Sequence, residues 1–273
     1  MIITLIGGDE KTLYMAEYLE EKGYEVYVSG FEMLEQADKY NIEFEKALNI
    51  SEYIILPLPT TRDGKTVEAP FSKRTIHLNE LVGFKNNTLA AMTEKELGFL
   101  DYYDETLKIL NAVPSAEGAI SQALRLTDIT LSGANCLIIG YGRIAKVLSR
   151  LLKAFGANLT VTARKPTDIA LAKSEGLNCI KTSEYLSAIS TADCIFNTVP
   201  YPLLVESVLK KCKTSAVIID LATKAATDFT AAERLGIKAV HAKSMPSKTA
   251  PKSAAIIIAD HIIEITNGGI KNG

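Results

Sequence analysis

The segment Cys136-Leu-Ile-Ile-Gly-Tyr-Gly-Arg-Ile-Ala145 joins an apolar strand, a glycine turn and a helix start without interruption. Gly140 permits the tight turn, Gly142 lets the backbone approach a pyrophosphate, and the small Ala145 lets the helix pack close to the strand. The amides of the first helical turn then favour an anion. The segment predicts a dinucleotide site, and the alternative is a plain turn in a doubly wound domain. The expected contacts are Gly140, Gly142, Arg143 and Ile144.

Strands and helices alternate strictly from Asn135 onward, which is typical of a parallel sheet covered on both faces. The expected strands are Cys136–Ile139, Leu159–Thr162, Cys179–Ile180, Cys194–Asn197, Val217–Asp220 and Ala239–His241. The amino-terminal part also opens as a strand, turn and helix, but Gly7-Gly8-Asp9 lacks the third small residue of the dinucleotide fingerprint. We therefore predict an α/β, two-lobed protein: a Rossmann-type doubly wound parallel sheet plus a smaller flavodoxin-like N-terminal α/β domain.

A change of composition around residues 111–115 marks the boundary between the lobes, which we place as domains 1–112 and 113–273. Pro114 disfavours helix just before it, Ser115 can cap a helix that runs to about Leu126, and Glu117 falls in its first turn. Residues 243–252 are expected to be a loop. The apolar helix expected over 253–266 must bury its surface, and we expect it to pack at the lobe junction.

Composition narrows the class of partner. The 273 residues carry 30 basic and 32 acidic side chains for a net charge of -2, which favours a small molecule over nucleic acid or a membrane surface. No apolar run approaches the roughly 20 residues of a membrane span, and the start lacks the charged head of a secretion signal. We expect a cytoplasmic protein. The four cysteines have no CxxC spacing, so no metal site is expected.

The second strand of the nucleotide domain leads into Ala163, Arg164 and Lys165. An NAD site usually places a carboxylate near this point for the adenosine ribose, whereas a cation suits a 2'-phosphate. We predict NADP(H) in preference to NAD(H), against the alternative of a surface cation near an unrelated nucleotide. Two later strand ends are expected to contact the cofactor through main-chain groups. The Asp220 side chain is equally suited to local hydrogen bonding and to a part in the chemistry. These contacts are Asn197, Thr198, Val199, Pro200, Leu221 and Ala222.

Candidate substrate contacts follow a strand of the first lobe. Thr60, Thr61 and Arg62 come directly after the strand expected over 53–58, and ligands of open α/β sheets gather beyond the carboxyl ends of strands. A solvated loop is the alternative for all three. Glu117 is either a simple helix cap or an acid, base or anchor at the substrate site.

An ordered series of short motifs resembles the A-subunit family of dipicolinate synthase. The series is Leu56-Pro-Leu-Pro59, Ala69-Pro-Phe-Ser72, Asn111-Ala-Val-Pro-Ser-Ala-Glu-Gly118, Thr127-Asp128, the Gly140 turn, Asn197-Thr-Val-Pro200, Asp220-Leu-Ala222 and Ala250-Pro-Lys-Ser-Ala254. The resemblance implies a sporulation enzyme of the mother-cell cytoplasm. It further implies an oxidoreductase of a lysine-pathway branch that oxidises a dihydrodipicolinate-type intermediate to pyridine-2,6-dicarboxylate. The resemblance also implies that the enzyme works with the flavoprotein-like B subunit of dipicolinate synthase. Whether the chain forms a homo-oligomer stays open.

The chain departs from the family pattern at two loops. The family has a glycine-rich turn where this chain reads Thr223-Lys-Ala-Ala-Thr227, and a Gly-Leu-Pro-Gly type loop where it reads Ser244-Met-Pro-Ser247. Side chains in place of glycines restrict close backbone approach to a ligand. These loops are therefore expected to be shifted, or the substrate to be altered.

If the resemblance holds, a dicarboxylate needs cationic or hydroxyl anchors and the reaction needs a base. The candidate anchors are Arg62, Lys248 and Lys252, the candidate hydrogen-bond donors are Thr60, Thr61 and Ser115, and Glu117 is the candidate proton acceptor. The alternative for the two lysines is surface charge at a helix entry. Rival functions are another two-lobed dehydrogenase, of the hydroxy-acid, shikimate or methylene-tetrahydrofolate type, and an NADP(H)-sensing module without turnover.

Overall fold

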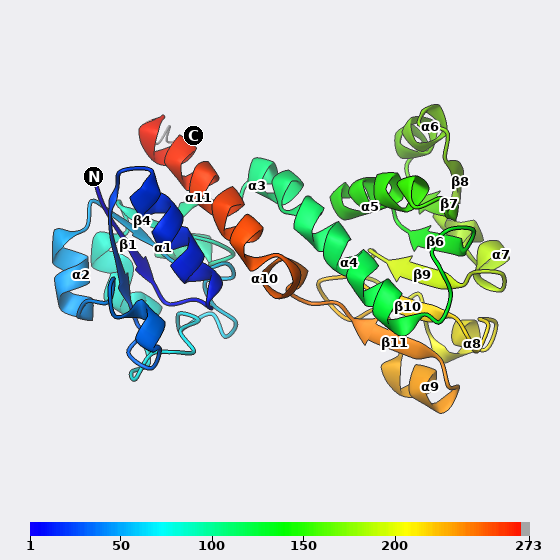
Figure 1. Ribbon diagram of the computed structural model, residues 1–273, viewed down its shortest axis with the longest axis horizontal. Coiled ribbons are helices and arrows are strands. Elements are labelled where there is room, and N and C mark those ends of the chain that lie inside the picture. The colour runs from blue at the N-terminus through cyan, green and yellow to red at the C-terminus, as the bar shows by residue number, and fades with distance from the viewer. Residues whose placement is uncertain (269–273) are drawn as a thin grey trace. The chain divides into compact units, whose positions relative to one another are not determined.

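The computed structural model describes residues 1–268 and divides the chain into two compact units (Figure 1). Met1–Asn111 and the segment that begins at Ala250 form the first unit, and Ala112–Thr249 form the second. Each unit has its own parallel sheet and its own buried apolar core. The α/β class with two domains is therefore confirmed.

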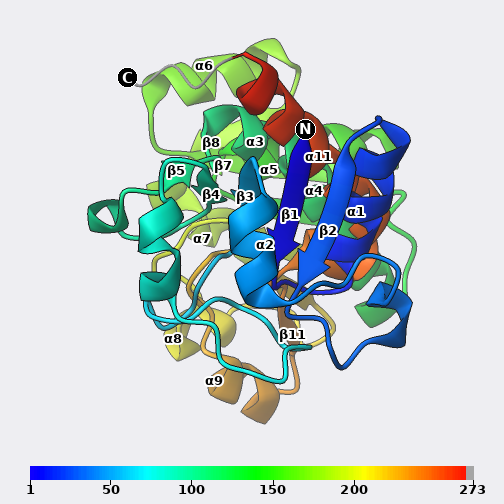
Figure 2. The same ribbon diagram turned by 90° about the vertical axis from the view of Figure 1, so that its left-hand side faces the viewer.

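The sheet of the first unit has the strand order β2-β1-β3-β4-β5, and every neighbouring pair is parallel. This order is the flavodoxin-like one, and Figure 2 shows β1 lying between β2 and β3. The strands are β1 (Ile2–Ile6), β2 (Glu25–Ser29), β3 (Tyr53–Ile55), β4 (Thr88–Ala90) and β5 (Leu100–Asp101). The helices are α1 (Lys11–Glu21), α2 (Phe44–Ile50), α3 (Glu105–Leu110) and α11 (Pro251–Asn267), with short 3-10 turns η1 (Glu35–Ala37), η2 (Leu78–Phe84) and η3 (Lys95–Leu97).

Helix α11 belongs to the first unit, whereas the sequence-based division placed it in the domain 113–273. Its apolar face, through Ala255, Ile258 and Ile262, lies in the same buried cluster as β1 and α1. The Tyr18 hydroxyl of α1 donates to Asp260 Oδ1 of α11 at 2.7 Å. The chain therefore returns to the first unit after the second is complete, a connection that local sequence patterns do not reveal.

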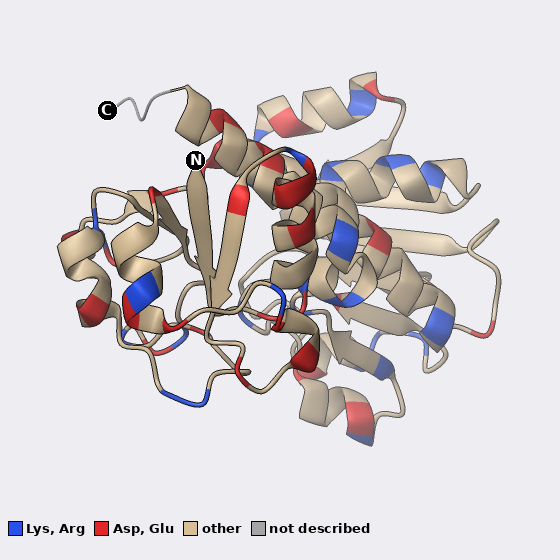
Figure 3. Cartoon of the chain, turned by 60° about the vertical axis from the view of Figure 1, so that its left-hand side comes forward, with Lys and Arg blue, Asp and Glu red and all other residues tan. Residues whose placement is uncertain are grey.

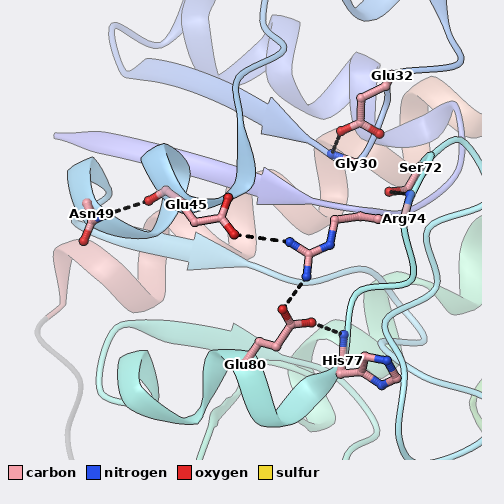
Figure 4. A network of polar contacts seen from close by, with 8 residues as sticks. All are labelled: Gly30, Glu32, Glu45, Asn49, Ser72, Arg74, His77 and Glu80. Atoms are coloured by element: carbon pink, nitrogen blue, oxygen red, sulfur yellow. Dashed lines mark hydrogen bonds and ion pairs between the residues drawn. The ribbon is translucent and has the colours of Figure 1, made fainter.

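Arg74 links two helical elements of the first unit, as Figure 4 shows. Its guanidinium lies 3.4 Å from Glu45 Oε1 on α2, stacks over the Phe44 ring and also pairs with Glu80 on η2. Glu80 Oε1 in turn accepts a hydrogen bond from the His77 amide at 2.7 Å. The network fixes the connection that precedes η2.

The sheet of the second unit has the order β11-β10-β9-β6-β7-β8, with every neighbouring pair parallel. This is the Rossmann order, in which the switch point lies between β6 and β9. The strands are β6 (Asn135–Ile139), β7 (Asn158–Ala163), β8 (Asn178–Lys181), β9 (Cys194–Asn197), β10 (Val217–Asp220) and β11 (Lys238–His241). The helices are α4 (Ala112–Leu126), α5 (Arg143–Ala154), α6 (Pro166–Ser174), α7 (Leu186–Ile189), α8 (Glu206–Leu209), α9 (Phe229–Arg234) and α10 (Met245–Thr249), with a short turn η4 (Thr182–Glu184).

Helix α4 begins at Ala112, three residues earlier than the cap expected at Ser115. Pro114 is accommodated because it falls in the first turn, where N–H groups have no intrahelical partner. Ser115 is therefore inside the helix rather than its cap, and Glu117 lies beyond the first turn. The capping interpretation of both residues is wrong.

The predicted loop at 243–252 contains helix α10 and the first two residues of α11 instead. Helix α10 packs on α4 at Gly118, where an added Cβ would lie 2.7 Å from Met245 Cβ. Ser244, just before α10, has a left-handed φ of 54°. Glycine adopts this conformation at little cost, so the backbone here retains the shape of a glycine loop although the sequence has serine.

Candidate active site

The turn after β6 depends on Gly140. Its φ is 103°, and its amide donates to Thr162 Oγ1 on β7 at 3.0 Å. A Cβ at this position would lie 2.4 Å from Thr198 Oγ1, which belongs to the loop after β9. Thr198 is held there because its hydroxyl donates to Ile139 O at 2.9 Å. Gly140 is therefore required both for the turn and for the close packing of the two loops at the switch point.

Gly142 has a different role, because its φ of -84° is accessible to any residue. It is exposed, it precedes the first residue of α5, and a Cβ added to it would meet nothing within 4 Å. The first turn of a helix presents N–H groups that have no intrahelical partner and favour an anion. This open approach to the start of α5 fits a dinucleotide pyrophosphate.

The other residues of the turn differ in their exposure. Arg143 is exposed and Ile144 is half-buried at the start of α5. Tyr141 points inward instead: its ring is buried and its hydroxyl donates to Glu175 Oε2 at 2.7 Å. Burial is the main cause that raises the pKa of the Tyr141 hydroxyl, and this hydrogen bond raises it further. Tyr141 therefore has a structural role in the turn.

Three cations gather at the ends of the two neighbouring strands β7 and β8. Ala163 is buried at the end of β7, and Arg164 and Lys165 follow it on the surface. The strand register pairs Ala163 with Lys181, the exposed last residue of β8. Lys181 was not among the residues expected from sequence, although its place at the end of the third Rossmann strand is a signal that could have found it. Cations at this edge are of the kind that binds phosphate oxygens.

The loops after β9 and β10 are joined by buried side chains. Asn197 and Asp220 have no exposed surface, and Asn197 Nδ2 donates to Asp220 Oδ1 at 3.1 Å. The same carboxylate accepts from the amides of Ala222 at 3.1 Å and Ala226 at 2.8 Å. Asn197 also brackets Val199, donating to its carbonyl and accepting from its amide. Both side chains are therefore committed to holding the loops in place.

These loops leave main-chain and partly exposed groups along one edge of the sheet. Thr198, Val199 and Leu221 are half-buried, Pro200 is exposed and Ala222 is buried. With the turn after β6 and the end of β7, they occupy the carboxyl ends of four adjacent strands, β10, β9, β6 and β7. Ligands of open α/β sheets bind at this edge, beside the switch point.

In the first unit, the loop after β3 carries Thr60, Thr61 and Arg62. Thr60 is fully buried, and its hydroxyl donates to Pro57 O at 2.9 Å and accepts from the Ala91 amide at 2.9 Å. Its hydrogen is thus already used inside the unit, so we assign Thr60 a structural role in place of the expected substrate contact. Arg62 is exposed and its Nε lies 2.7 Å from Glu68 Oε2.

Thr61 lies in a tight turn with Asp63. Its hydroxyl donates to Asp63 Oδ1 at 3.0 Å and accepts from the Gly64 amide. The amides of Lys65 and Thr66 donate to the same aspartate and hold its pKa well below the ordinary range. Thr61 is half-buried, so it retains partial access to solvent.

The remaining candidates are divided between the two units. Lys252 lies in the first turn of α11 in the first unit, whereas Ser115 and Glu117 on α4 and Lys248 on α10 belong to the second. Glu117, Lys248 and Lys252 are exposed and Ser115 is half-buried. Each side chain except Ser115 is therefore open to solvent.

Lys11, which sequence reasoning missed, starts α1 directly after the glycine turn of β1. Its side chain is only 11% exposed, and its Nζ lies 3.6 Å from Asp9 Oδ2. Burial lowers the pKa of Lys11, and the neighbouring Asp9 partly opposes this shift. A lysine two residues after Gly7-Gly8-Asp9 was the available signal, because it places a cation at the carboxyl end of the first strand.

Other kinds of site receive no support from residues 1–268. In that range no three or more His, Cys, Asp or Glu side chains come together as a metal site, and no helix has the length and apolar character to span a bilayer. Figure 3 shows basic and acidic positions interspersed along the helices.

Comparison with known proteins places this geometry in a family. Residues 2–96 match the model of the N-terminal domain of the dipicolinate synthase A subunit, and residues 107–234 match the NAD binding domain of D-isomer specific 2-hydroxyacid dehydrogenases. The second match supports an oxidoreductase with a nicotinamide cofactor. D-lactate dehydrogenase of Salmonella, 17% identical with a TM-score of 0.65 over 100% of this chain and 98% of that one, shares the fold.

Full-length relatives extend the match over both units. The dipicolinate synthase A subunit of Bacillus subtilis is 32% identical over 94% of this chain and 93% of its own length. The crystal structure of the dipicolinate synthase A subunit from Bacillus halodurans has a TM-score of 0.85 at 27% identity and covers 97% of each chain. The chain therefore belongs to the family of dipicolinate synthase A subunits.

Proposed function

We propose that this chain is an NADP-dependent dehydrogenase that oxidises a dihydrodipicolinate-type intermediate to pyridine-2,6-dicarboxylate. The observation that carries the proposal is one edge of the sheet in the second unit. The open approach at Gly142 lies in the turn after β6, and the cations Arg164, Lys165 and Lys181 lie at the ends of β7 and β8, the next two strands. Together they suit a dinucleotide with a 2'-phosphate. The relatives supply the substrate class.

The residues of the second unit would bind and orient the cofactor. The start of α5 takes the diphosphate, the cations after β7 and β8 take the 2'-phosphate, and the loops after β9 and β10 hold the nicotinamide half through main-chain groups. When bound, the cofactor supplies a hydride acceptor. The Asn197–Asp220 hydrogen bond keeps the two nicotinamide-side loops in register.

The substrate is a dicarboxylate, so its recognition needs cations and hydrogen-bond donors. Arg62, Lys248 and Lys252 are the proposed anchors, with Ser115 as a donor. Thr61 would join them as a donor by turning its hydroxyl away from Asp63. Oxidation of the dihydropyridine removes a hydride from ring carbon and a proton, and the ring becomes aromatic. We assign the proton to Glu117, whose exposed carboxylate on α4 is suited to exchange protons with water.

The family also points to a partner. The Bacillus relatives are named as the A component of dipicolinate synthase, and we propose that this chain works with the flavoprotein-like B subunit in the mother-cell cytoplasm during sporulation. The first unit would then provide the substrate lobe and the second the cofactor lobe, with the boundary along the chain near residue 112.

The test is oxidation of dihydrodipicolinate, generated in place, by the purified chain with NADP⁺, with and without the B subunit. We expect reduced nicotinamide and pyridine-2,6-dicarboxylate to form in equal amounts, measured by absorbance and mass spectrometry. An Arg164→Ala variant should need more NADP⁺ for the same rate. Absence of both products, even with the B subunit present, would contradict the proposed activity.

A further inference from the structure

His241 is the last residue of β11, the strand that borders β10 at one side of the Rossmann sheet (Figure 1). The parallel register pairs it with Asp220, the last residue of β10. The Ala242 amide then donates to Asp220 O at 2.8 Å, next to the point where both strands end. The segment that follows β10 continues past this end of the sheet and has to be fixed by other contacts.

Two side chains hold the main chain of Ala222 in that segment. Its amide donates to Asp220 Oδ1 at 3.1 Å, and its carbonyl oxygen lies 2.8 Å from His241 Nε2. A carbonyl oxygen can only accept, so Nε2 carries the hydrogen and His241 is the donor. The imidazole ring is half-buried and stacks on Phe229, with the ring centroids 6.0 Å apart and the planes at 25°. The ring is therefore held both by its donor atom and by its face.

The backbone of residues 222–227 does not fix its own shape through special conformations. The segment contains no glycine, and none of its residues has a left-handed φ. Residues 223–225 are also exposed, so packing does not hold them. The path of this segment therefore depends on hydrogen bonds such as those from Asp220 and His241.

The bond from His241 also sets the direction of a second main-chain group. The C=O and N–H of a trans peptide point in opposite directions, so holding the Ala222 carbonyl orients the Thr223 amide. That amide has no hydrogen-bond partner among residues 1–268. It is thus an oriented main-chain donor at the carboxyl edge of the sheet, where ligands of open α/β sheets bind.

We propose that His241 is a positioning residue for the nicotinamide half of the cofactor. The inference rests on the proposed function, in which the loops after β9 and β10 hold the nicotinamide through main-chain groups. His241 fixes the peptide group between Ala222 and Thr223, and the Thr223 amide donates to the cofactor. Because small errors in placing reacting groups are costly in rate, loss of this bond would slow hydride transfer more than it weakens binding.

The test compares the full chain with His241→Phe, His241→Gln and His77→Phe. Phenylalanine can keep the stacking on Phe229 but has no donor, whereas glutamine can donate from its amide. His77→Phe makes the same exchange at an exposed histidine of the first unit. The probe is NADPH, followed by calorimetric titration and by the fluorescence of its nicotinamide, which reports how firmly the ring is held. Turnover of dihydrodipicolinate with NADP⁺ gives kcat and KM.

We expect His241→Phe to bind NADPH nearly as tightly as the full chain, because the contacts to both phosphate groups remain. The gain of nicotinamide fluorescence on binding should be largely lost. In turnover, kcat should fall about tenfold while KM for NADP⁺ stays within about twofold. His241→Gln should restore most of the fluorescence and of kcat, and His77→Phe should match the full chain in both.

The outcomes separate the two proposals. If the full chain binds NADPH but forms no product, even with the B subunit, the proposed activity fails and the fluorescence decides the role of His241. If His241→Phe keeps the fluorescence and kcat of the full chain and lowers only the unfolding midpoint, His241 is purely structural and the assignment is overturned. Should His241→Phe not fold, His241→Leu, which also lacks a donor, replaces it with the same outcomes.

Discussion

Asn197 Nδ2 donates to Asp220 Oδ1 at 3.1 Å, and neither residue has any exposed surface. This hydrogen bond joins the loops that leave β9 and β10, next to the switch point of the Rossmann sheet. The same carboxylate also accepts from the Ala222 and Ala226 amides, so it organises the segment that follows β10. A buried carboxylate with three donors is therefore the centre of the loops after β9 and β10.

Asp220→Asn should lower the free energy of unfolding by about 2 to 4 kcal/mol, because the new amide NH₂ would face an N–H group that now donates to a carboxylate. Thermal or urea unfolding measures this change. Asp228→Asn is the matched control, since Asp228 only caps α9 through the Ala231 amide. Asparagine is an equally good cap, so that variant should be nearly neutral. Equal stabilities of the two variants would contradict the role of Asp220.

Gly140 and Gly142 should respond differently to alanine. Gly140→Ala must strain a φ of 103° and place a methyl group 2.4 Å from Thr198 Oγ1, so we expect a loss of at least about 2 kcal/mol in stability. Gly142→Ala should leave the unfolding midpoint nearly unchanged, because its φ is ordinary and the added methyl meets no atom within 4 Å.

The same Gly142→Ala variant should bind NADPH at least about tenfold more weakly, because the methyl group enters the space assigned to the diphosphate. Calorimetric titration of NADPH measures this loss. Undiminished affinity would place the diphosphate elsewhere.

The loop at 244–247, one of the two that depart from the family pattern, gives two stability predictions of opposite sign. Ser244 has a φ of 54°, so Ser244→Gly should raise the free energy of unfolding by about 1 kcal/mol. Ser247 lies inside α10, and Ser247→Gly should lower it by about 0.5 kcal/mol. Chemical denaturation of both variants checks the signs. Destabilisation by Ser244→Gly would mean that this backbone does not need a glycine-like conformation.

The sequence alone predicted the Rossmann sheet well because each of its strands is a short apolar run between turn residues. The expected strand Cys194–Asn197 and the expected strand Val217–Asp220 agree with the structure residue for residue. The flavodoxin-like nature of the first sheet was also confirmed. Local patterns were sufficient here because hydrophobic periodicity and glycine turns depend only on residues that are close in the sequence.

Features that depend on distant contacts were not predictable in this way. The return of α11 to the first unit is set by its packing on α1, more than 200 residues earlier in the chain. The burial of Thr60 and Lys11 likewise follows from tertiary contacts, so one expected site residue became structural. The start of α4 before Pro114 shows that a proline signal gives a boundary only to within a turn.

The most direct test of cofactor choice is calorimetric titration of NADPH and NADH into the full chain and into Arg164→Ala. We predict that the full chain binds NADPH at least about tenfold more tightly than NADH, because each charge-assisted bond to the 2'-phosphate contributes about 1.5 to 3 kcal/mol. Arg164→Ala should remove most of that preference and leave NADH binding unchanged. Equal or tighter binding of NADH by the full chain, with no effect of Arg164→Ala on either nucleotide, would contradict an NADP-dependent dehydrogenase.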